Sequence, residues 1–301
     1  MNDAAILTKG LTKFYGFRKG IQTMDLQVER GEVFGFLGPN GAGKTTTIRT
    51  LLDFIRATEG TASIFGLDSR KNSLEIRKRV SYLPGDIALY EKMTGREILS
   101  YFANLRGHVD WKHVDDLADR LQCNLSQTIH SLSRGNKQKL GLIQAFMQQP
   151  ELIIMDEPTS GLDPLIQQEF YGLVQEVKAD GRTVFISSHN MSEVEKICDR
   201  VGIIRNGELV TVEDVSALKE RAVHQLEVYF AKPILEDDFQ KIPGVRNVET
   251  NGTVLRCTVM GKPDALIKVI ARFETEKIIS HEPNLEDIFL SYYSEGVGYD
   301  E

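Results

Sequence analysis

The side chains best suited to chemistry begin in a glycine-rich segment near the N-terminus. It reads Gly38, Pro39, Asn40, Gly41, Ala42, Gly43, Lys44 and Thr45. The spacing G-x-x-x-x-G-K-[ST] is that of a phosphate-binding loop, in which glycines let backbone N–H groups approach a phosphate without a Cβ in the way. We expect Lys44 to reach the β- and γ-phosphates of a nucleotide and the Thr45 hydroxyl to take a Mg²⁺ coordination position.

The residues on either side supply the structural context that this motif needs. The segment Glu32–Leu37 before it is a short apolar run, which predicts a buried strand. After it, Ile48, Leu51, Leu52 and Ile55 recur at helical spacing and predict an amphipathic helix. The loop therefore lies between a strand and a helix whose N-terminus adds fixed positive potential for an anion.

A pair of adjacent carboxylates follows a second apolar run. Leu152–Met155 has the pattern of a buried parallel strand, and it ends in Asp156 and Glu157. An aspartate at the end of such a strand can hold Mg²⁺ through water, and the next glutamate can accept a proton from an attacking water. A further buried strand is predicted over Thr183–Ser187, and His189 comes shortly after it.

Two polar segments flank these carboxylates. Residues 131–138 read Ser-Leu-Ser-Arg-Gly-Asn-Lys-Gln, and residues 158–163 read Pro-Thr-Ser-Gly-Leu-Asp. Together with the phosphate loop, these motifs resemble those of the ATP-binding subunit of an ABC transporter over about residues 4–215. The narrower likeness is to the ATPases of ABC-2 type exporters, such as drug-resistance exporters. It rests on the variant signature Leu-Ser-Arg-Gly-Asn and on the segments Tyr82–Asp86 and Glu282–Phe289.

The resemblance implies a role for each motif. The phosphate loop would run from Gly38 to Thr46, and Tyr15 would stack on adenine, with Phe14 as the alternative. Asp156 would serve Mg²⁺, Glu157 would be the general base, and His189 would hold the γ-phosphate and the attacking water. Three residues would act across a dimer of two copies: Ser133 and Gly135 would contact the γ-phosphate bound by the second copy, and Asp163 would link the two sites.

One position departs from the family pattern. Most members have a glutamine after the strand near Val80–Leu83, a ligand close to Mg²⁺ that also senses the membrane partner. This chain has Gly85 there, followed by Asp86. Because a carboxylate oxygen is a suitable ligand for Mg²⁺, we predict that Asp86 takes over part of that role.

The pattern of elements predicts an α/β fold in two domains. The resemblance implies that residues 1–220 form an ABC ATPase domain: a P-loop NTPase core with an antiparallel β subdomain, expected over 4–37, and a helical subdomain within 44–150. Residues 221–301 would form an accessory α+β domain, whose β-α-β-β-α-β order suggests a ferredoxin-like fold. Within it we expect helices over 233–241 and Pro263–Phe273, and a last helix over Asn284–Tyr293.

Composition narrows the class of protein. The chain has 301 residues with a formal net charge of −7, which argues against a primary nucleic-acid binder. No apolar run reaches the roughly 18 residues of a transmembrane helix, and the N-terminus does not read as a secretory signal. The resemblance implies in addition a cytoplasmic protein, held at the inner face of the membrane by a separate permease, that binds ATP and Mg²⁺ as a homodimer. The three cysteines are far apart and predict reduced thiols.

Other interpretations fit fewer residues. A soluble ABC protein acting on ribosomes or DNA usually carries two cassettes or long coiled-coil arms, which this chain lacks. A GTPase reading of Asn136-Lys137-Gln138-Lys139 lacks the aspartate that binds the guanine amine. A nucleotide sensor that never hydrolyses is disfavoured because Glu157 and His189 are both present. His108 and His113, on either side of Trp111, are expected to be surface residues and not a metal site.

Overall fold

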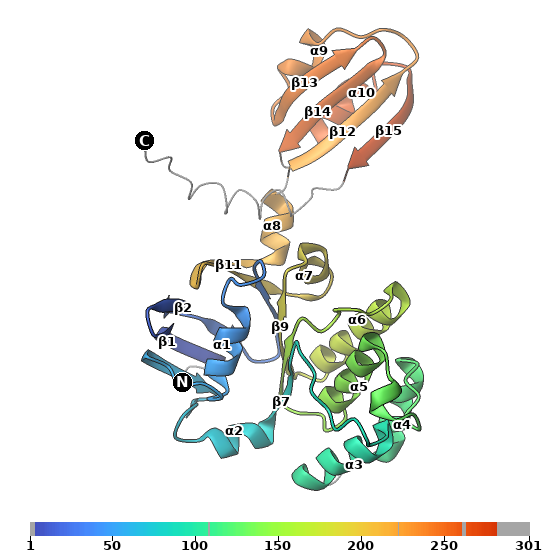
Figure 1. The fold of residues 1–301 in the computed structure, drawn as a ribbon. Coiled ribbons are helices and arrows are strands. Elements are labelled where there is room, and N and C mark those ends of the chain that lie inside the picture. Colours follow the sequence, from blue (N-terminus) through green and yellow to red (C-terminus); the bar gives the residue numbers. More distant parts are fainter. Residues whose placement is uncertain (1–3, 108, 222, 261–262, 282–301) are drawn as a thin grey trace. The chain divides into compact units, whose positions relative to one another are not determined.

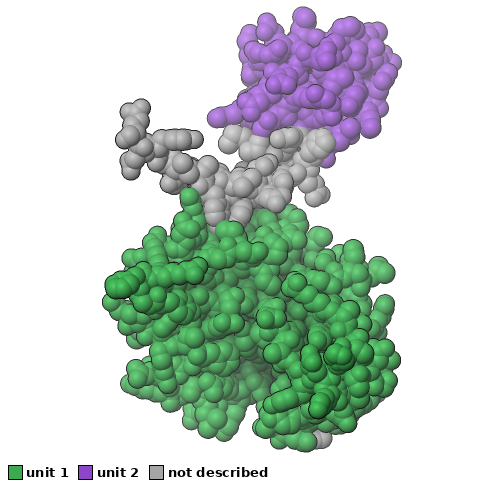
Figure 2. Space-filling model, viewed as in Figure 1, with its two compact units in different colours: residues 1–213 green, residues 214–301 purple. Residues whose placement is uncertain are grey.

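The computed structural model describes residues 4–107, 109–221, 223–260 and 263–281 (Figure 1). Contacts between residues divide the chain into two compact units, Met1–Glu213 and Asp214–Glu301 (Figure 2). The division falls close to the expected boundary between residues 220 and 221. That an ATPase domain and an accessory domain occupy the two sides of this boundary stays a prediction.

A six-stranded sheet forms the centre of the first unit. Its spatial order is β11 (Glu208–Asp214), β10 (Arg200–Arg205), β4 (Val33–Leu37), β9 (Thr183–Ser188), β8 (Leu152–Asp156), β7 (Val80–Leu83). All neighbouring pairs from β10 to β7 are parallel. Strands β4, β8 and β9 are buried along their whole length, which explains their continuous apolar runs. Because parallel strands end at the same edge, the phosphate loop, the carboxylates and His189 emerge together.

A second sheet in the first unit is antiparallel. It contains β1 (Ala4–Tyr15), β2 (Arg18–Met24), β3 (Gln27–Glu29), β5 (Glu59–Ile64), β6 (Leu67–Asp68). The antiparallel sheet predicted over residues 4–37 is thus confirmed for β1, β2 and β3. It is wrong for β4, which pairs in parallel with β9 and β10. All five residues of β4 are buried, so this strand needs cover on both faces.

Helices complete the first unit around these sheets (Figure 1). They are α1 (Lys44–Leu51), α2 (Ser73–Arg79), α3 (Gly95–Arg106), α4 (Trp111–Arg120), α5 (Arg134–Phe146), α6 (Pro164–Ala179), α7 (Met191–Ile197) and a 3₁₀ turn, η1 (Ile129–Ser131). The predicted helix after the phosphate loop stops earlier than its apolar spacing suggests. Asp53 takes a φ of 55°, and the N–H groups of Phe54 and Ile55 both donate to the Arg49 carbonyl, which ends α1.

Strand β10 turns directly into β11. Asn206 and Gly207 have φ values of 49° and 82°, the left-handed conformations that a two-residue hairpin requires. An Asn-Gly pair between two apolar runs predicts such a hairpin from the sequence alone, and the structure confirms it. The charged stretch after it, Glu213–Arg221, is by its sequence typical of a connector but contains a short helix, α8 (Val215–Arg221).

The second unit has the predicted β-α-β-β-α-β order. Its elements are β12 (Val223–Phe230), α9 (Asp237–Gln240), β13 (Val245–Asn251), β14 (Val254–Met260), α10 (Asp264–Ile270) and β15 (Thr275–His281). The sheet order β13-β14-β12-β15, antiparallel throughout, is that of a ferredoxin-like fold. Helix α9 is shorter than the predicted 233–241, because Pro233 and the residues after it remain non-helical. The helix predicted over Asn284–Tyr293 lies outside the described residues.

Candidate functional site

The phosphate loop connects β4 to α1 in the predicted manner. Gly41 and Gly43 have φ values of 83° and 113°, which side chains with a Cβ rarely adopt. A Cβ on Gly38 would stand 2.5 Å from the carbonyl oxygen of Ile204, so the loop needs glycine there for close packing. The Lys44 ammonium folds back along the loop and donates to the carbonyl oxygens of Gly38, at 2.6 Å, and Pro39, at 3.3 Å.

A cavity of about 550 Å³ opens beside this loop. Its lining consists of Tyr15, Arg18, Lys19, Gly20, Pro39, Asn40, Gly41, Gly43, Lys44, Thr45, Thr46, Arg49 and Glu157. Tyr15 lines the cavity and is 48% exposed, and the Lys13 Nζ lies 5.3 Å from its ring centroid. Phe14, the alternative for base stacking, is half-buried and does not line the cavity. The volume and the cationic lining suit a nucleotide.

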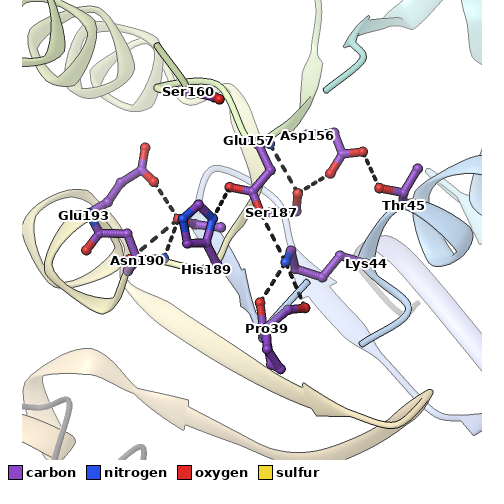
Figure 3. Close-up of polar contacts among 12 residues, drawn as sticks. Pro39, Lys44, Thr45, Asp156, Glu157, Ser160, Ser187, His189, Asn190 and Glu193 are labelled. Atoms are coloured by element: carbon purple, nitrogen blue, oxygen red, sulfur yellow. Dashed lines mark hydrogen bonds and ion pairs between the residues drawn. The ribbon is translucent and has the colours of Figure 1, made fainter. Parts of the chain in front are cut away.

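Asp156 ends β8 directly opposite the first residues of α1. The Thr45 hydroxyl donates to its Oδ2 at 2.6 Å, and the Ser187 hydroxyl, from the end of β9, donates to its Oδ1 (Figure 3). The carboxyl group is thereby held by hydroxyls from two neighbouring elements. Sequence reasoning noted Ser187 only as the end of a strand, because its contact with Asp156 depends on the pairing of β8 with β9.

Glu157 lies between the phosphate-binding lysine and His189. Its Oε1 is 3.0 Å from the Lys44 Nζ, and its Oε2 is 2.6 Å from the His189 Nδ1 (Figure 3). The backbone N–H of Glu157 donates to the Ser187 carbonyl at 3.1 Å. The structure thus brings together three predicted residues from three strand ends, and the arrangement places a carboxylate and an imidazole beside the group that would bind phosphate.

The signature residues lie apart from this cavity. Ser133 caps the N-terminus of α5, where its hydroxyl accepts a hydrogen bond from the Asn136 N–H at 3.3 Å. Gly135 packs so tightly against the next loop that a Cβ would meet the Gly161 carbonyl oxygen at 2.7 Å. Asp163 caps α6 and is exposed. None of the three lines the cavity beside the phosphate loop, so within one chain they are separated from the predicted nucleotide site.

Gly85 comes directly after β7 and beside Asp156. A Cβ at this position would lie 3.3 Å from the Asp156 carbonyl oxygen and 3.5 Å from its Oδ2. A longer side chain here would therefore stand next to the predicted metal ligand. Asp86 is exposed, and among the described residues it has no hydrogen bond or ion pair in the structure.

Tyr82 is a polar neighbour of Asp156 that the sequence did not assign to the site. Burial and the negative charge of Asp156 raise the pKa of its phenol to about 12. The hydroxyl therefore stays protonated at neutral pH and can act as a hydrogen-bond donor. Its ring packs on Phe54, with the two centroids 5.6 Å apart.

The remaining predictions concern the cysteines and two histidines, to which no catalytic or metal-binding role was assigned. Cys123, Cys198 and Cys257 are free and buried, as expected of reduced thiols. No cluster of histidine, cysteine and carboxylate side chains that could hold a metal ion occurs within residues that the structure describes, which include His113. His108 lies outside them.

Comparisons with known proteins agree with this fold. Residues 21–160 match the ABC transporter family. The chain is 35% identical to the bacitracin transport ATP-binding protein BcrA of Bacillus licheniformis, over 97% of this chain and 98% of the relative. It is 30% identical to the daunorubicin resistance ATP-binding protein DrrA3 of Streptomyces coeruleorubidus, over 96% of each.

Solved structures show the same fold. An ATP-binding subunit of an ABC transporter superposes with a TM-score of 0.65 at 30% identity, covering 71% of this chain and 92% of the other. A dimeric ATP-binding cassette in a post-hydrolysis state, bound to ADP and phosphate, gives a TM-score of 0.65 at 20% identity over 70% of this chain and 98% of the other. The chain belongs to the family of ABC transporter ATP-binding proteins and is an ATP-hydrolysing subunit.

Proposed function

We propose that two copies of this chain close on two MgATP molecules and power export through a separate membrane permease. The observation that carries the proposal is the continuous contact of Lys44, Glu157 and His189 at the edge of the parallel sheet. The relatives named for bacitracin transport and daunorubicin resistance support an exporter of the ABC-2 type. An action on ribosomes or DNA has no such support.

In the proposed reaction, water attacks the γ-phosphorus of ATP. Glu157 takes a proton from this water as the new P–O bond forms, and the bond to the β,γ-bridging oxygen breaks to release ADP. Lys44 stabilises the charge on the phosphates, and His189 holds the γ-phosphate and the water in line with the leaving group. Tyr15 stacks on adenine at the rim of the cavity.

The donor set beside the phosphate loop fits Mg²⁺. A hydroxyl from Thr45 and a carboxylate from Asp156 are already 2.6 Å apart, and hard oxygen ligands of this kind are those that Mg²⁺ prefers. We assign these two residues to the metal, with Asp86 as a further candidate. When bound, the ion neutralises negative charge on the β- and γ-phosphates.

A homodimer explains why the signature residues lie away from the cavity of their own chain. In the proposed assembly, Ser133 and Gly135 of one copy contact the γ-phosphate bound by its partner, and Asp163 links the two sites. A two-fold arrangement uses the same surface from both copies, so each nucleotide site is completed by the other chain. The solved dimer of a cassette bound to ADP and phosphate supports this assembly.

The permease would contact a group of exposed apolar side chains around α3. Tyr90 and Tyr101 meet edge to face with their centroids 6.0 Å apart, and Leu105 lies exposed on the same helix as Tyr101. A cluster of this kind is a candidate protein interface. No described helix is long and apolar enough to cross a bilayer, which is in keeping with a path supplied by another subunit and with a position at the inner face of the membrane.

One experiment tests the assembly and the chemistry together. Tagged Glu157→Gln protein is purified from detergent-solubilised host membranes with and without ATP. Because the amide cannot accept the proton, turnover should fall at least about 100-fold while ATP binding persists. We expect ATP-dependent dimers, and we expect a membrane protein with several predicted spans to co-purify.

The control is Glu276→Gln, an exposed carboxylate in the second unit that should leave turnover unchanged. Near wild-type hydrolysis by the Glu157→Gln protein would refute its role as the base. Recovery of ribosomes or DNA without any membrane protein would refute the exporter assignment.

A further inference from the structure

A buried carboxyl group lies just outside the proposed catalytic residues. Glu193, on α7, is only 2% exposed, and burial raises the pKa of its carboxyl above the usual range. Glutamate is almost never fully buried unless hydrogen bonds hold it in place. The groups that contact the Glu193 carboxyl therefore indicate its role.

The Glu193 carboxyl contacts, first, the turn that carries His189. The Ser188 hydroxyl donates to the Glu193 Oε2 at 2.5 Å and accepts a hydrogen bond from the Asn190 N–H at 3.0 Å (Figure 3). The Ser188 carbonyl oxygen in turn accepts from the Gly38 N–H of the phosphate loop at 3.1 Å. Glu193 thus holds Ser188, which is itself bonded to Asn190 on the other side of His189 and to the phosphate loop.

The Glu193 carboxyl also lies close to the turn that carries Glu157. Thr159 lies close enough to the Glu193 carboxyl to lower its pKa, although by less than burial raises it, while the buried Glu193 Oε1 has no hydrogen-bond partner among the described residues. Thr159 is two residues after Glu157, and the intervening Pro158 is held by the Gln138 side-chain amide, which donates to its carbonyl oxygen at 2.8 Å. One carboxyl group therefore lies close to both segments whose side chains meet in the Glu157–His189 contact.

The His189 ring needs such support because little else holds it. Its side chain is 57% exposed, so packing does not fix its orientation. The ring reaches Glu157 at 2.6 Å from a backbone that is anchored at Ser188 and Asn190. A shift of this turn by about 1 Å would be enough to break the contact and to cost roughly 100-fold in rate.

We infer that Glu193 is a positioning residue for ATP hydrolysis, which holds the His189 turn in the place that the contact of His189 with Glu157 requires. It touches neither nucleotide nor water and acts through its hydrogen bond with Ser188. The inference rests on the proposed roles of Glu157 and His189. It requires a hydrogen-bonding side chain of this length at position 193 and does not require a negative charge.

The test compares Glu193→Ala with Glu193→Gln in the full-length protein. The alanine variant leaves the Ser188 hydroxyl without its acceptor, so kcat should fall about 10- to 100-fold while KM for ATP changes less than about threefold. The glutamine amide oxygen can still accept from Ser188 at the same side-chain length, so kcat should return to within about threefold of wild type. Long-range ¹H–¹⁵N NMR should show an altered His189 imidazole signal only in the alanine variant.

Further variants keep the test decisive. Ser188→Ala should lower kcat like Glu193→Ala, and the double variant should lose little more, because both changes remove one hydrogen bond. Ser192→Ala, exposed on the same helix, is the matched control and should behave as wild type. If the melting curve of Glu193→Ala shows that this variant does not fold, the Glu193→Gln and Ser188→Ala variants carry the test.

Two results would overturn the inference: wild-type kcat in Glu193→Ala, or a glutamine variant as impaired as the alanine variant. Failure of the proposed function gives a different pattern. In that case Glu157→Gln and His189→Ala would themselves retain turnover, whatever the variants at position 193 do.

Discussion

Glu157 combines an unusual backbone with a central position in the site. Its φ of 52° lies in the left-handed region, which costs a residue with a side chain about 1–2 kcal/mol. The N–H of Glu157 is held by the Ser187 carbonyl and the following proline carbonyl by Gln138, so the neighbouring strand and helix offset this strain. The conformation turns the side chain away from the line of β8 and toward Lys44 and His189.

The glycine at position 85 leads to a residue-level prediction. Because Gly85 places no side chain beside Asp156, it supplies no oxygen ligand there, and we propose that Asp86, the next residue, supplies one instead. We expect Asp86→Ala to raise the Mg²⁺ concentration for half-maximal ATPase rate by about 10-fold, at the lower end of the range for a lost outer ligand. A Mg²⁺ titration of the rate measures this.

The matched variant is Asp110→Ala, which removes a carboxylate from the N-cap of α4 and should leave the Mg²⁺ dependence unchanged. Gly85→Gln in the Asp86→Ala background should restore the lower Mg²⁺ requirement, since the new side chain stands beside Asp156. An unaltered titration curve in Asp86→Ala would contradict the role given to this residue.

The sequence predicted those site residues that belong to local patterns. Lys44, Asp156 and Glu157 follow apolar runs with a fixed spacing, so their neighbours in the chain reveal them. Ser187 and Glu193 carry no such signal, because their partners depend on which strands pair and on where α7 packs. A serine or glutamate of this kind becomes distinctive only once its burial and contacts are known.

At the level of elements, the same distinction holds. Strands β8 and β9 and the β10–β11 hairpin follow from runs and turns that are local in sequence. The parallel pairing of β4 is not local, because it depends on β9 and β10, which come more than a hundred residues later. The early end of α1 depends on the positive φ of Asp53, a turn that the apolar spacing does not encode.

The junction of α5 with the loop before α6 gives the element-level prediction. A Cβ on Gly135 would lie 2.7 Å from the Gly161 backbone carbonyl, so Gly135→Ala must displace one of the two segments. We expect a loss of about 1–3 kcal/mol in the free energy of unfolding, measured by denaturant titration, together with reduced ATPase rate. Gly172→Ala is the control, because within α6 its Cβ would meet only the Arg120 Nη2 at 4.0 Å.

That control should stabilise the protein by about 0.5–1 kcal/mol, since alanine is favoured over glycine inside a helix. Equal effects of the two alanine substitutions would show that the close approach of Gly135 to Gly161 does not matter.

At the scale of the whole chain, each unit has a hydrophobic core of its own. In the first, Phe185 packs against Phe34 and Phe36, with ring centroids 5.8 and 5.5 Å apart. In the second, Phe230, Phe239 and Phe273 pack together with centroids 5.6 to 5.8 Å apart. The phosphate loop and every residue that lines the cavity beside it belong to the first unit.

Separate cores and a single nucleotide site predict how the full chain unfolds. Calorimetry of the Glu157→Gln protein should show two transitions, because units with their own cores need not melt together. ATP at about 100 times its Kd should stabilise the first unit by roughly 2.7 kcal/mol and raise its Tm by about 5–10 °C, with the other transition unmoved. Adding the Lys44→Ala substitution should abolish this rise in Tm.

A single transition, or an equal shift of both transitions on adding ATP, would mean that the two units unfold as one and that nucleotide binding stabilises the whole chain.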